Sequence, residues 1–266
     1  MLDRYSRDIN YLRISVTDRC NLRCVYCMPE EGIELMKHED ILSYEKIYET
    51  VLEGVKKGIT KVRLTGGEPL IRKGIIQLVE MIASIPEIID LSMTTNGILL
   101  EKYANELAKA GLNRVNISMD TLSAEKYKEI TRGGDINKVF AGIEAARHAG
   151  LSPIKINCVV FKNRNEKDAV DVAKFCEKNG LSVRFIHQMN LQTGEFSIVE
   201  GGEGGDCKNC NRLRLTADGT FRPCLFNDLA FQINGRSAAS AFDLAIQNKP
   251  KVGTMSLSGK FYGIGG

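Results

Sequence analysis

The sequence predicts an α/β fold: a partial (βα)6 barrel of the TIM type, followed by a small C-terminal subdomain. Three observations predict it. Short β-rich runs alternate with amphipathic helical stretches through the first two-thirds of the chain. The β-rich runs are short and apolar, which indicates a parallel sheet covered by helices. After Met189 the composition changes, because Gly and Glu become frequent. With 266 residues, the chain can form one barrel-sized domain or two ordinary ones.

The barrel is expected to contain six β–α repeats. The expected strands are residues 11–16, 61–65, 91–95, 115–118, 154–160 and 183–189, and the expected helices are 43–57, 74–84, 101–110, 123–130, 136–148 and 166–179. Ser43 can cap the first helix, and Gly58, Gly111 and Gly180 follow helix ends. Right-handed crossovers curl such a sheet toward a barrel, and reactive groups gather at the carboxyl ends of its strands. Six strands leave one side open to a larger substrate.

The C-terminal part is expected to form a domain of its own. Residues 192–206 are rich in Gly and Glu and predict an irregular linker. Residues 211–216 and 220–224, joined through Asp218-Gly219, predict a hairpin. A helix at 237–247 and an extended tail ending in Gly265-Gly266 follow. We therefore expect two domains, 1–190 and 191–266.

Composition favours a soluble globular protein of the cytoplasm. The chain is 43% hydrophobic and 26% charged, and its net charge of +3 gives no reason to expect nucleic-acid or membrane binding. The amino-terminal residues lack the apolar core of a signal peptide, and no apolar run approaches the ~20 residues of a membrane helix. Six of the eight Cys lie in two tight groups, which indicates metal ligation in a reducing compartment. Cys158 and Cys176 are expected to be ordinary buried thiols.

The first Cys group has the spacing of an iron–sulfur site. Cys20, Cys24 and Cys27 are arranged as C-x3-C-x2-C in the loop after the first strand. Three thiolates bind three corners of one cluster, so the fourth iron stays open to another ligand. The alternative is a zinc knuckle, which needs a fourth Cys or His nearby, and the nearest His is His38.

The second Cys group also provides three thiolates. Cys207, Cys210 and Cys224 are arranged as C-x2-C-x13-C, with the last Cys at the end of the hairpin. Zinc is possible here if Asp206 or Asp228 is the fourth ligand. We favour a second cluster with one open iron over zinc, because that iron can bind a substrate nitrogen or oxygen.

At this point the chain resembles a known family. The first Cys motif, with an aromatic residue before its last Cys, is similar to that of the radical S-adenosylmethionine superfamily. The whole chain resembles the GTP 3′,8-cyclases, which begin molybdenum-cofactor biosynthesis. The matching segments are Leu12 to Cys20, Arg63 to Leu70, Thr94-Thr95-Asn96-Gly97, Asn116 to Asp120, Arg184-Phe185-Ile186, Cys207 to Leu215, Cys224 and Gly265-Gly266.

The resemblance implies cofactors and site residues. It implies two [4Fe–4S] clusters, with S-adenosylmethionine at the open iron of the first. The residues that fall where the family contacts S-adenosylmethionine are Tyr26, Gly67, Ser118 and Met189. Those that fall where it binds GTP are Arg13, Arg63, Thr94, Lys155, Arg184, Arg212 and Arg214, of which Arg212 and Arg214 also serve the radical chemistry. A lone Lys is more often a surface ion-pair partner, but several cations inside one barrel favour an anion such as triphosphate.

The resemblance also implies a reaction and partners. The reaction is conversion of GTP to 3′,8-cyclo-7,8-dihydro-GTP, with flavodoxin or ferredoxin as electron donor and a possible homodimer. The chain departs from the family at residues 190–206, where the family usually has a much longer segment. That leaves open a radical enzyme of the same architecture acting on a peptide or another nucleotide. A non-catalytic iron–sulfur or zinc protein would have no use for the Gly66-Gly67-Glu68-Pro69 loop or the interior cations.

Overall fold

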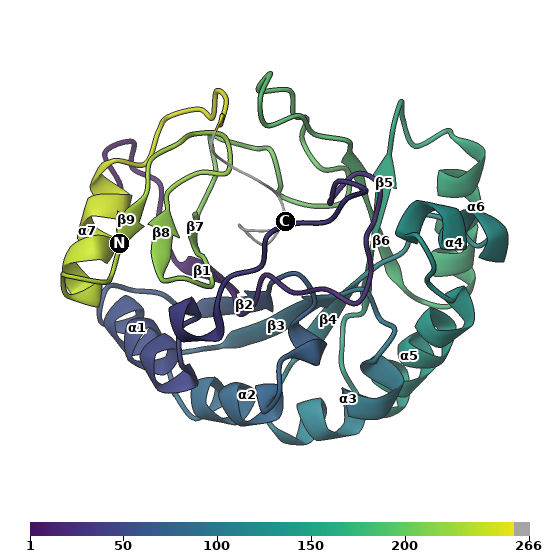
Figure 1. The fold of residues 1–266 in the computed structure, drawn as a ribbon, viewed down its shortest axis with the longest axis horizontal. Coiled ribbons are helices and arrows are strands. Elements are labelled where there is room, and N and C mark those ends of the chain that lie inside the picture. The colour runs from purple at the N-terminus through teal and green to yellow at the C-terminus, as the bar shows by residue number, and fades with distance from the viewer. Residues whose placement is uncertain (258–266) are drawn as a thin grey trace.

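The sheet of the computed structural model, which describes residues 1–257, curves into an open barrel (Figure 1). Six strands pair in parallel in their order along the chain. They are β1 (Tyr11–Ser15), β2 (Lys61–Thr65), β3 (Asp90–Thr95), β4 (Arg114–Ser118), β5 (Lys155–Val160) and β6 (Ser182–His187). The predicted α/β fold with a partial barrel is confirmed.

Helices cover the outer side of this sheet (Figure 1). The helices of the barrel are α1 (Tyr44–Lys56), α2 (Ile75–Ala83), α3 (Leu100–Lys109), α4 (Ala124–Thr131), α5 (Ile136–His148) and α6 (Lys167–Lys178), and single 3-10 turns lie at His38–Asp40 and Pro69–Ile71. The predicted cap is present, since the Ser43 side chain accepts a hydrogen bond from the Lys46 N–H. Gly111 follows α3 with φ +97°, a conformation that Gly adopts at low cost.

Alternation along each strand separates the core from the barrel interior. Leu12 and Ile14 are fully buried in the main apolar core together with Ile47 and Val51 of α1. The residue between them, Arg13, lies on the opposite face, because successive side chains of a strand point to opposite sides. The apolar face of the sheet therefore packs on the helices, and polar side chains face the interior.

The C-terminal region adds three strands to the same sheet. These strands are β7 (Arg212–Leu215), β8 (Thr220–Arg222) and β9 (Phe231–Gln232), and α7 (Ala238–Gln247) follows them. β7 pairs with β1 in parallel and with β8 in antiparallel, which confirms the hairpin. The pairing with β1 was not expected from the sequence. Within residues 1–257 the strand order is β6-β5-β4-β3-β2-β1-β7-β8-β9.

Other expectations are met with small differences. The sixth strand ends at His187, so Met189 lies in the loop beyond it. Residues 192–206 contain no regular helix or strand, as predicted. Cys158 and Cys176 are buried, also as predicted. The division into domains 1–190 and 191–266 stays a prediction, and Gly265-Gly266 lies outside the described residues. No helix within residues 1–257 has the length and apolar character needed to cross a membrane.

Candidate active site

A cavity of about 370 Å³ lies inside the barrel and is lined by both Cys groups. This volume is within the range of small-molecule sites. Five arginines from the sheet also line it: Arg13, Arg63, Arg184, Arg212 and Arg214. So do the four residues that the sequence assigned to S-adenosylmethionine, which are Tyr26, Gly67, Ser118 and Met189. The fold therefore brings nearly all predicted site residues to one space.

The loop that carries the first Cys group rests on the loop after β2. The Gly67 N–H donates to the Thr17 carbonyl at 2.8 Å, and the Glu68 N–H donates to the Arg19 carbonyl at 2.8 Å. A Cβ atom at position 67 would lie 2.2 Å from the Arg19 oxygen, so only Gly fits there. The Gly-Gly-Glu-Pro sequence thus positions the backbone just before Cys20.

Glu68 joins the ends of β2 and β3. Its carboxylate accepts hydrogen bonds from the Thr95 hydroxyl at 2.8 Å, the Asn96 N–H at 2.7 Å and the Leu70 N–H at 3.0 Å. The side chain is deeply buried, and this burial raises the pKa of Glu68 to about 7 in spite of the three donors. Asn96 Nδ2 reaches back to Asn21 Oδ1 at 2.8 Å, which links the end of β3 to the Cys loop.

Tyr26 connects the Cys loop to the far side of the barrel. Its hydroxyl donates to Asp120 Oδ2 at 2.7 Å, and Asp120 Oδ1 accepts from the Val159 N–H at 2.8 Å. Burial raises the pKa of Asp120 to about 6, although both hydrogen bonds favour its charged form. Asp120, two residues beyond the end of β4, was not among the residues predicted from the sequence.

The first three thiols fit an iron–sulfur cluster. Burial, together with the neighbouring anionic groups, raises the pKa of Cys24 to about 12 and that of Cys27 to about 11. Thiolates this close together in a buried site need a positive counter-charge, which a cluster core provides. Within residues 1–257, no three His, Cys, Asp or Glu side chains lie close enough to hold a single metal ion. Three thiolates on one loop can bind three iron atoms of a cluster, so this set of ligands fits an iron–sulfur cluster.

Three arginines form one row across the sheet. Arg13 on β1 is in register with Arg63 on β2 and with Arg214 on β7. Burial and the neighbouring guanidinium groups lower the pKa of Arg13 well below its usual value, and that of Arg214 to about 10. Like charges directly opposite each other on a sheet repel, and an anion bound across the row would offset this repulsion.

Polar atoms beside the row lack partners within the described residues. These buried atoms are Thr94 Oγ1, Asn157 Oδ1 and Arg184 Nε. All three residues line the cavity. A buried polar group without a hydrogen bond is costly, so a polar ligand in the cavity would satisfy them.

Lys155 differs from the other predicted GTP contacts. It begins β5, so it lies near the amino-terminal end of the strand and does not line the cavity. Its pKa is lowered by burial and by nearby arginines, of which Arg184 has the largest effect. Lys155 therefore lies near the arginines of the barrel but is not part of the cavity wall.

The second Cys group lies at the base of the β7–β8 hairpin. Cys207 and Cys210 precede β7, and Cys224 follows β8. Burial opposes ionisation of Cys210, but the charges of Lys249 and Arg212 outweigh it and lower its pKa to about 7. The two carboxylates considered as zinc ligands have other contacts, since Asp206 accepts from Asn209 and Asp228 from Ser256.

Comparison with known proteins identifies the family. The model of the Radical SAM superfamily matches residues 14–176. The GTP 3′,8-cyclase of Thermodesulfovibrio yellowstonii is 44% identical over 92% of this chain and 91% of its own length. That of Petrotoga mobilis is 40% identical over 94% of each. This chain belongs to the GTP 3′,8-cyclase family.

The cyclase relatives are longer than this chain. Their alignments span 292 and 304 positions, whereas the chain has 266 residues, so the relatives contain residues that are missing here. This agrees with the shortened form that the sequence predicted. That residues 190–206 are the place of the shortening stays a prediction.

Solved structures confirm the fold of this cyclase family member. SuiB of Streptococcus suis bound to S-adenosylmethionine has a TM-score of 0.66 at 16% identity, over 88% of this chain and 65% of that one. The structure of anSMEcpe with bound AdoMet has a TM-score of 0.62 at 19% identity, over 90% and 81%. At such identities the similarity shows the fold alone.

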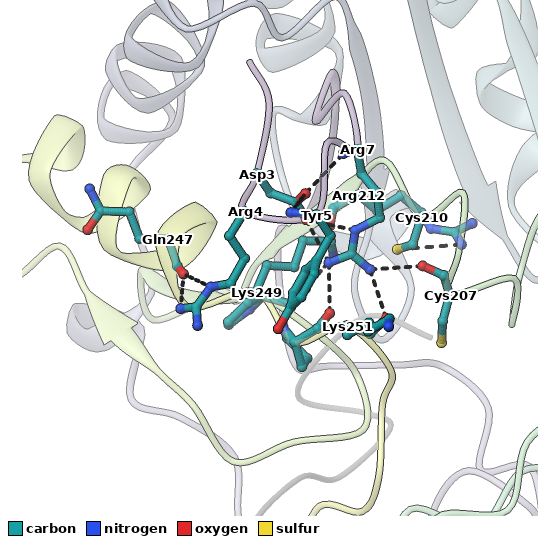
Figure 2. A network of polar contacts seen from close by, with 12 residues as sticks. Asp3, Arg4, Tyr5, Arg7, Cys207, Cys210, Arg212, Gln247, Lys249 and Lys251 are labelled. Carbon is teal, nitrogen blue, oxygen red and sulfur yellow. Dashed lines mark hydrogen bonds and ion pairs between the residues drawn. The ribbon is translucent and has the colours of Figure 1, made fainter.

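Sequence reasoning missed several residues that shape the site. Asp120 could have been found from its place after the fourth strand, where reactive groups gather. Lys249 and Arg7 could not, because neither belongs to a motif and both reach the second Cys group from distant parts of the chain. Figure 2 shows Arg7 beside Cys207 and Lys249 near Arg212, in line with the hydrogen bonds that each donates to that residue's backbone carbonyl.

Proposed function

We propose that this protein is a GTP 3′,8-cyclase, which converts GTP to 3′,8-cyclo-7,8-dihydro-GTP in the first step of molybdenum-cofactor biosynthesis. In this reaction a hydrogen atom leaves ribose C3′, C3′ becomes bonded to guanine C8, and N7 of the guanine takes up one electron and one proton. The observation that carries the proposal is one cavity lined by two groups of three cysteines and five arginines. The curated relatives named GTP 3′,8-cyclase support it over most of the chain.

Cys20, Cys24 and Cys27 are the proposed ligands of the first [4Fe–4S] cluster. When bound, this cluster and S-adenosylmethionine supply the radical chemistry that removes hydrogen. The residues proposed to surround S-adenosylmethionine are Tyr26, Gly67, Ser118 and Met189. Gly67 lets the backbone come close, Ser118 offers a hydroxyl, and Met189 offers an adaptable apolar surface. The Tyr26 hydroxyl is engaged by Asp120, so Tyr26 contributes its ring and holds the loop in place.

Cys207, Cys210 and Cys224 are the proposed ligands of a second [4Fe–4S] cluster. Its vacant coordination site is proposed to hold the guanine edge of GTP. The lowered pKa of Cys210, about 7, favours this assignment, because metal ligands must be deprotonated. Arg212, whose guanidinium lies 4.0 Å from the Cys210 sulfur, is placed to contact both this site and substrate.

The arginines are proposed to bind the triphosphate. Arg13, Arg63 and Arg214 form the row across the sheet, and Arg184 and Arg212 lie in the same cavity. A triphosphate relieves the repulsion within the row and accepts several charge-assisted hydrogen bonds. Thr94 is proposed as a hydroxyl contact, and Lys155 as a more distant charge. Arg212 and Arg214 are the residues proposed to act on the reacting nucleotide.

Further partners follow from the reaction. Reductive cleavage of S-adenosylmethionine consumes an electron, so we propose flavodoxin or ferredoxin as the donor. A homodimer is proposed from the family resemblance alone. Cytoplasmic location is proposed because iron–sulfur ligation needs reduced thiols, and the described cysteines are free.

One anaerobic experiment tests the function. The protein is reconstituted with iron and sulfide, reduced with dithionite, and given S-adenosylmethionine with GTP deuterated at C3′. We expect 5′-deoxyadenosine that carries deuterium, together with a cyclised nucleotide of the same nucleobase. Reactions with ATP or without nucleotide serve as controls, and both should give little 5′-deoxyadenosine.

Each other outcome points elsewhere. Cleavage of S-adenosylmethionine that is indifferent to GTP would shift the assignment to a peptide or a different nucleotide. Absence of cleavage would leave a non-catalytic iron–sulfur protein. Replacement of Arg214 by Ala should suppress the product while both clusters remain, and unchanged turnover would refute the role of Arg214.

A further inference from the structure

Lys249 is a buried cation beside the second Cys group. It lies just after α7, is only 2% exposed, and lines the cavity. Its Nζ donates to the carbonyl oxygens of Arg212 and Pro223, both at 2.7 Å. A lysine is almost never buried to this degree unless its charge is paired with another group.

The two carbonyls belong to the segments that carry two of the cysteines. Arg212 comes two residues after Cys210, and Pro223 comes directly before Cys224. A single ammonium group therefore joins the start of β7 to the end of β8. Because both bonds are to backbone, they fix the position of the chain at each cysteine.

Arg7 holds the third cysteine to the same segment. Its Nη1 donates to the Cys207 carbonyl at 2.8 Å and to the Lys251 carbonyl at 3.1 Å, and its Nη2 donates to the Pro250 carbonyl at 2.7 Å. Asp3 neutralises Arg7 in a buried ion pair of 2.6 Å. Figure 2 shows this guanidinium between the amino-terminal turn, Cys207 and Lys251. The segment that carries Lys249 is thus anchored to Cys207 as well.

Lys249 and Arg7 differ in the groups that neutralise their charges. Arg7 has Asp3, whereas Lys249 forms no ion pair with any carboxylate of the described residues. Burial lowers the pKa of Lys249, and the charges of Cys210 and Cys224, when these thiols are ionised, act in the opposite direction. A buried charge without a partner is strongly destabilising, so the thiolates must offset it.

We propose that Lys249 is a positioning residue of the second cluster: its ammonium fixes the backbone at Cys210 and Cys224, and its charge balances the thiolates that bind iron. This inference rests on the proposed second cluster and adds a residue that none of the sequence motifs contains. A positive charge beside a cluster also stabilises its reduced form, so Lys249 raises the reduction potential.

The test compares two lysines of one segment. Lys249→Met keeps the length of the stem but removes the charge and both donors. Lys251→Met makes the same change at an exposed side chain only two residues away. Each variant is reconstituted anaerobically beside the unmodified protein. Iron and sulfide per chain, the midpoint potential of the second cluster and the thermal midpoint of the iron-free protein are measured.

We expect Lys249→Met to bind about half the iron and sulfide of the unmodified protein, because one of two clusters is lost. If some second cluster remains, its midpoint potential should be lower. Lys251→Met should match the unmodified protein in all measurements. Full iron content with an unchanged potential in Lys249→Met would overturn the inference.

A second pair of variants covers a failure to fold. Lys249→Gln keeps an amide NH₂ donor group without the charge, and Lys249→Arg keeps the charge. The Arg variant should retain more of the second cluster than the Gln variant, at a potential nearer the unmodified value. Equal behaviour of the two, or loss of folding of the iron-free protein in both Met and Gln variants, would show a general structural role and reject the proposal. An unmodified protein with only one cluster would instead reject the second cluster itself.

Discussion

The Tyr26 hydroxyl donates a hydrogen bond of 2.7 Å to the Asp120 carboxylate. Tyr26 belongs to the loop of the first Cys group, and Asp120 follows β4. The aromatic residue that precedes the last Cys of the motif therefore does more than flank a ligand. It fixes the Cys loop, which follows β1, to the end of β4, three places away in the sheet. The same carboxylate accepts a hydrogen bond from the Val159 N–H of β5.

Replacement of Tyr26 by Phe should loosen this loop. The variant keeps the ring but removes the donor, so the buried Asp120 keeps only the Val159 N–H, and its pKa should rise further. We expect the free energy of unfolding of the iron-free protein, measured in urea, to fall by about 1–3 kcal/mol. Tyr48→Phe, at a partly exposed tyrosine of α1, is the matched control and should change stability little. Equal effects of the two changes would argue against the Tyr26 bond.

Stability should depend on pH through Glu68. Its pKa is about 7 in the folded protein, above the ordinary value of 4.5, so folding favours the protonated form. Stability from this group is complete below about pH 4.5 and is lost as pH rises through 7, by about 3 kcal/mol in total. Urea unfolding of the iron-free protein between pH 4.5 and 8 measures this loss.

Glu68→Gln removes the titration and should flatten the profile in that window. The amide cannot accept all three hydrogen bonds, so Gln also lowers stability by an amount that does not vary with pH. Asp120, with a pKa of about 6, keeps part of the slope in both proteins. A profile with the same slope in Glu68→Gln would mean that Glu68 does not titrate in this range.

Gly67→Ala should disrupt the seat of the first Cys group. The added methyl would meet the Arg19 carbonyl at 2.2 Å, and backbone atoms cannot yield as a flexible side chain can. We expect the free energy of unfolding to fall by about 1–3 kcal/mol, as at other overpacked sites, and the first cluster to be retained less well. Gly54→Ala on α1 meets only side chains, at 3.2 Å, and should retain both clusters. Iron content and the S-adenosylmethionine affinity of the two variants check this.

Local pattern predicted much of the site, and long-range pairing accounts for what it missed. The spacing within each Cys group and the two-residue spacing of Arg212 and Arg214 are local features. The sequence therefore predicts that the members of each set lie together. The pairing of β7 with β1 joins residues far apart in sequence, and nothing in either strand specifies its partner. Yet this pairing is what sets Arg214 beside Arg13. The family resemblance likewise implied Lys155 as a GTP contact, but whether Lys155 reaches the cavity depends on where β5 begins.

The arginine row gives the last prediction. Arg13→Met removes the middle cation of the row, so the repulsion between the row members falls. Binding of GTP should weaken by about tenfold or more, since one charge-assisted contact to phosphate is worth about 1.5–3 kcal/mol. Lys155 does not line the cavity, so Lys155→Met should weaken GTP binding less than Arg13→Met does. Isothermal titration with GTP at two salt concentrations measures both. If Arg13→Met lost stability and kept its GTP affinity, the row would be a structural feature, and the triphosphate would have to bind elsewhere in the barrel.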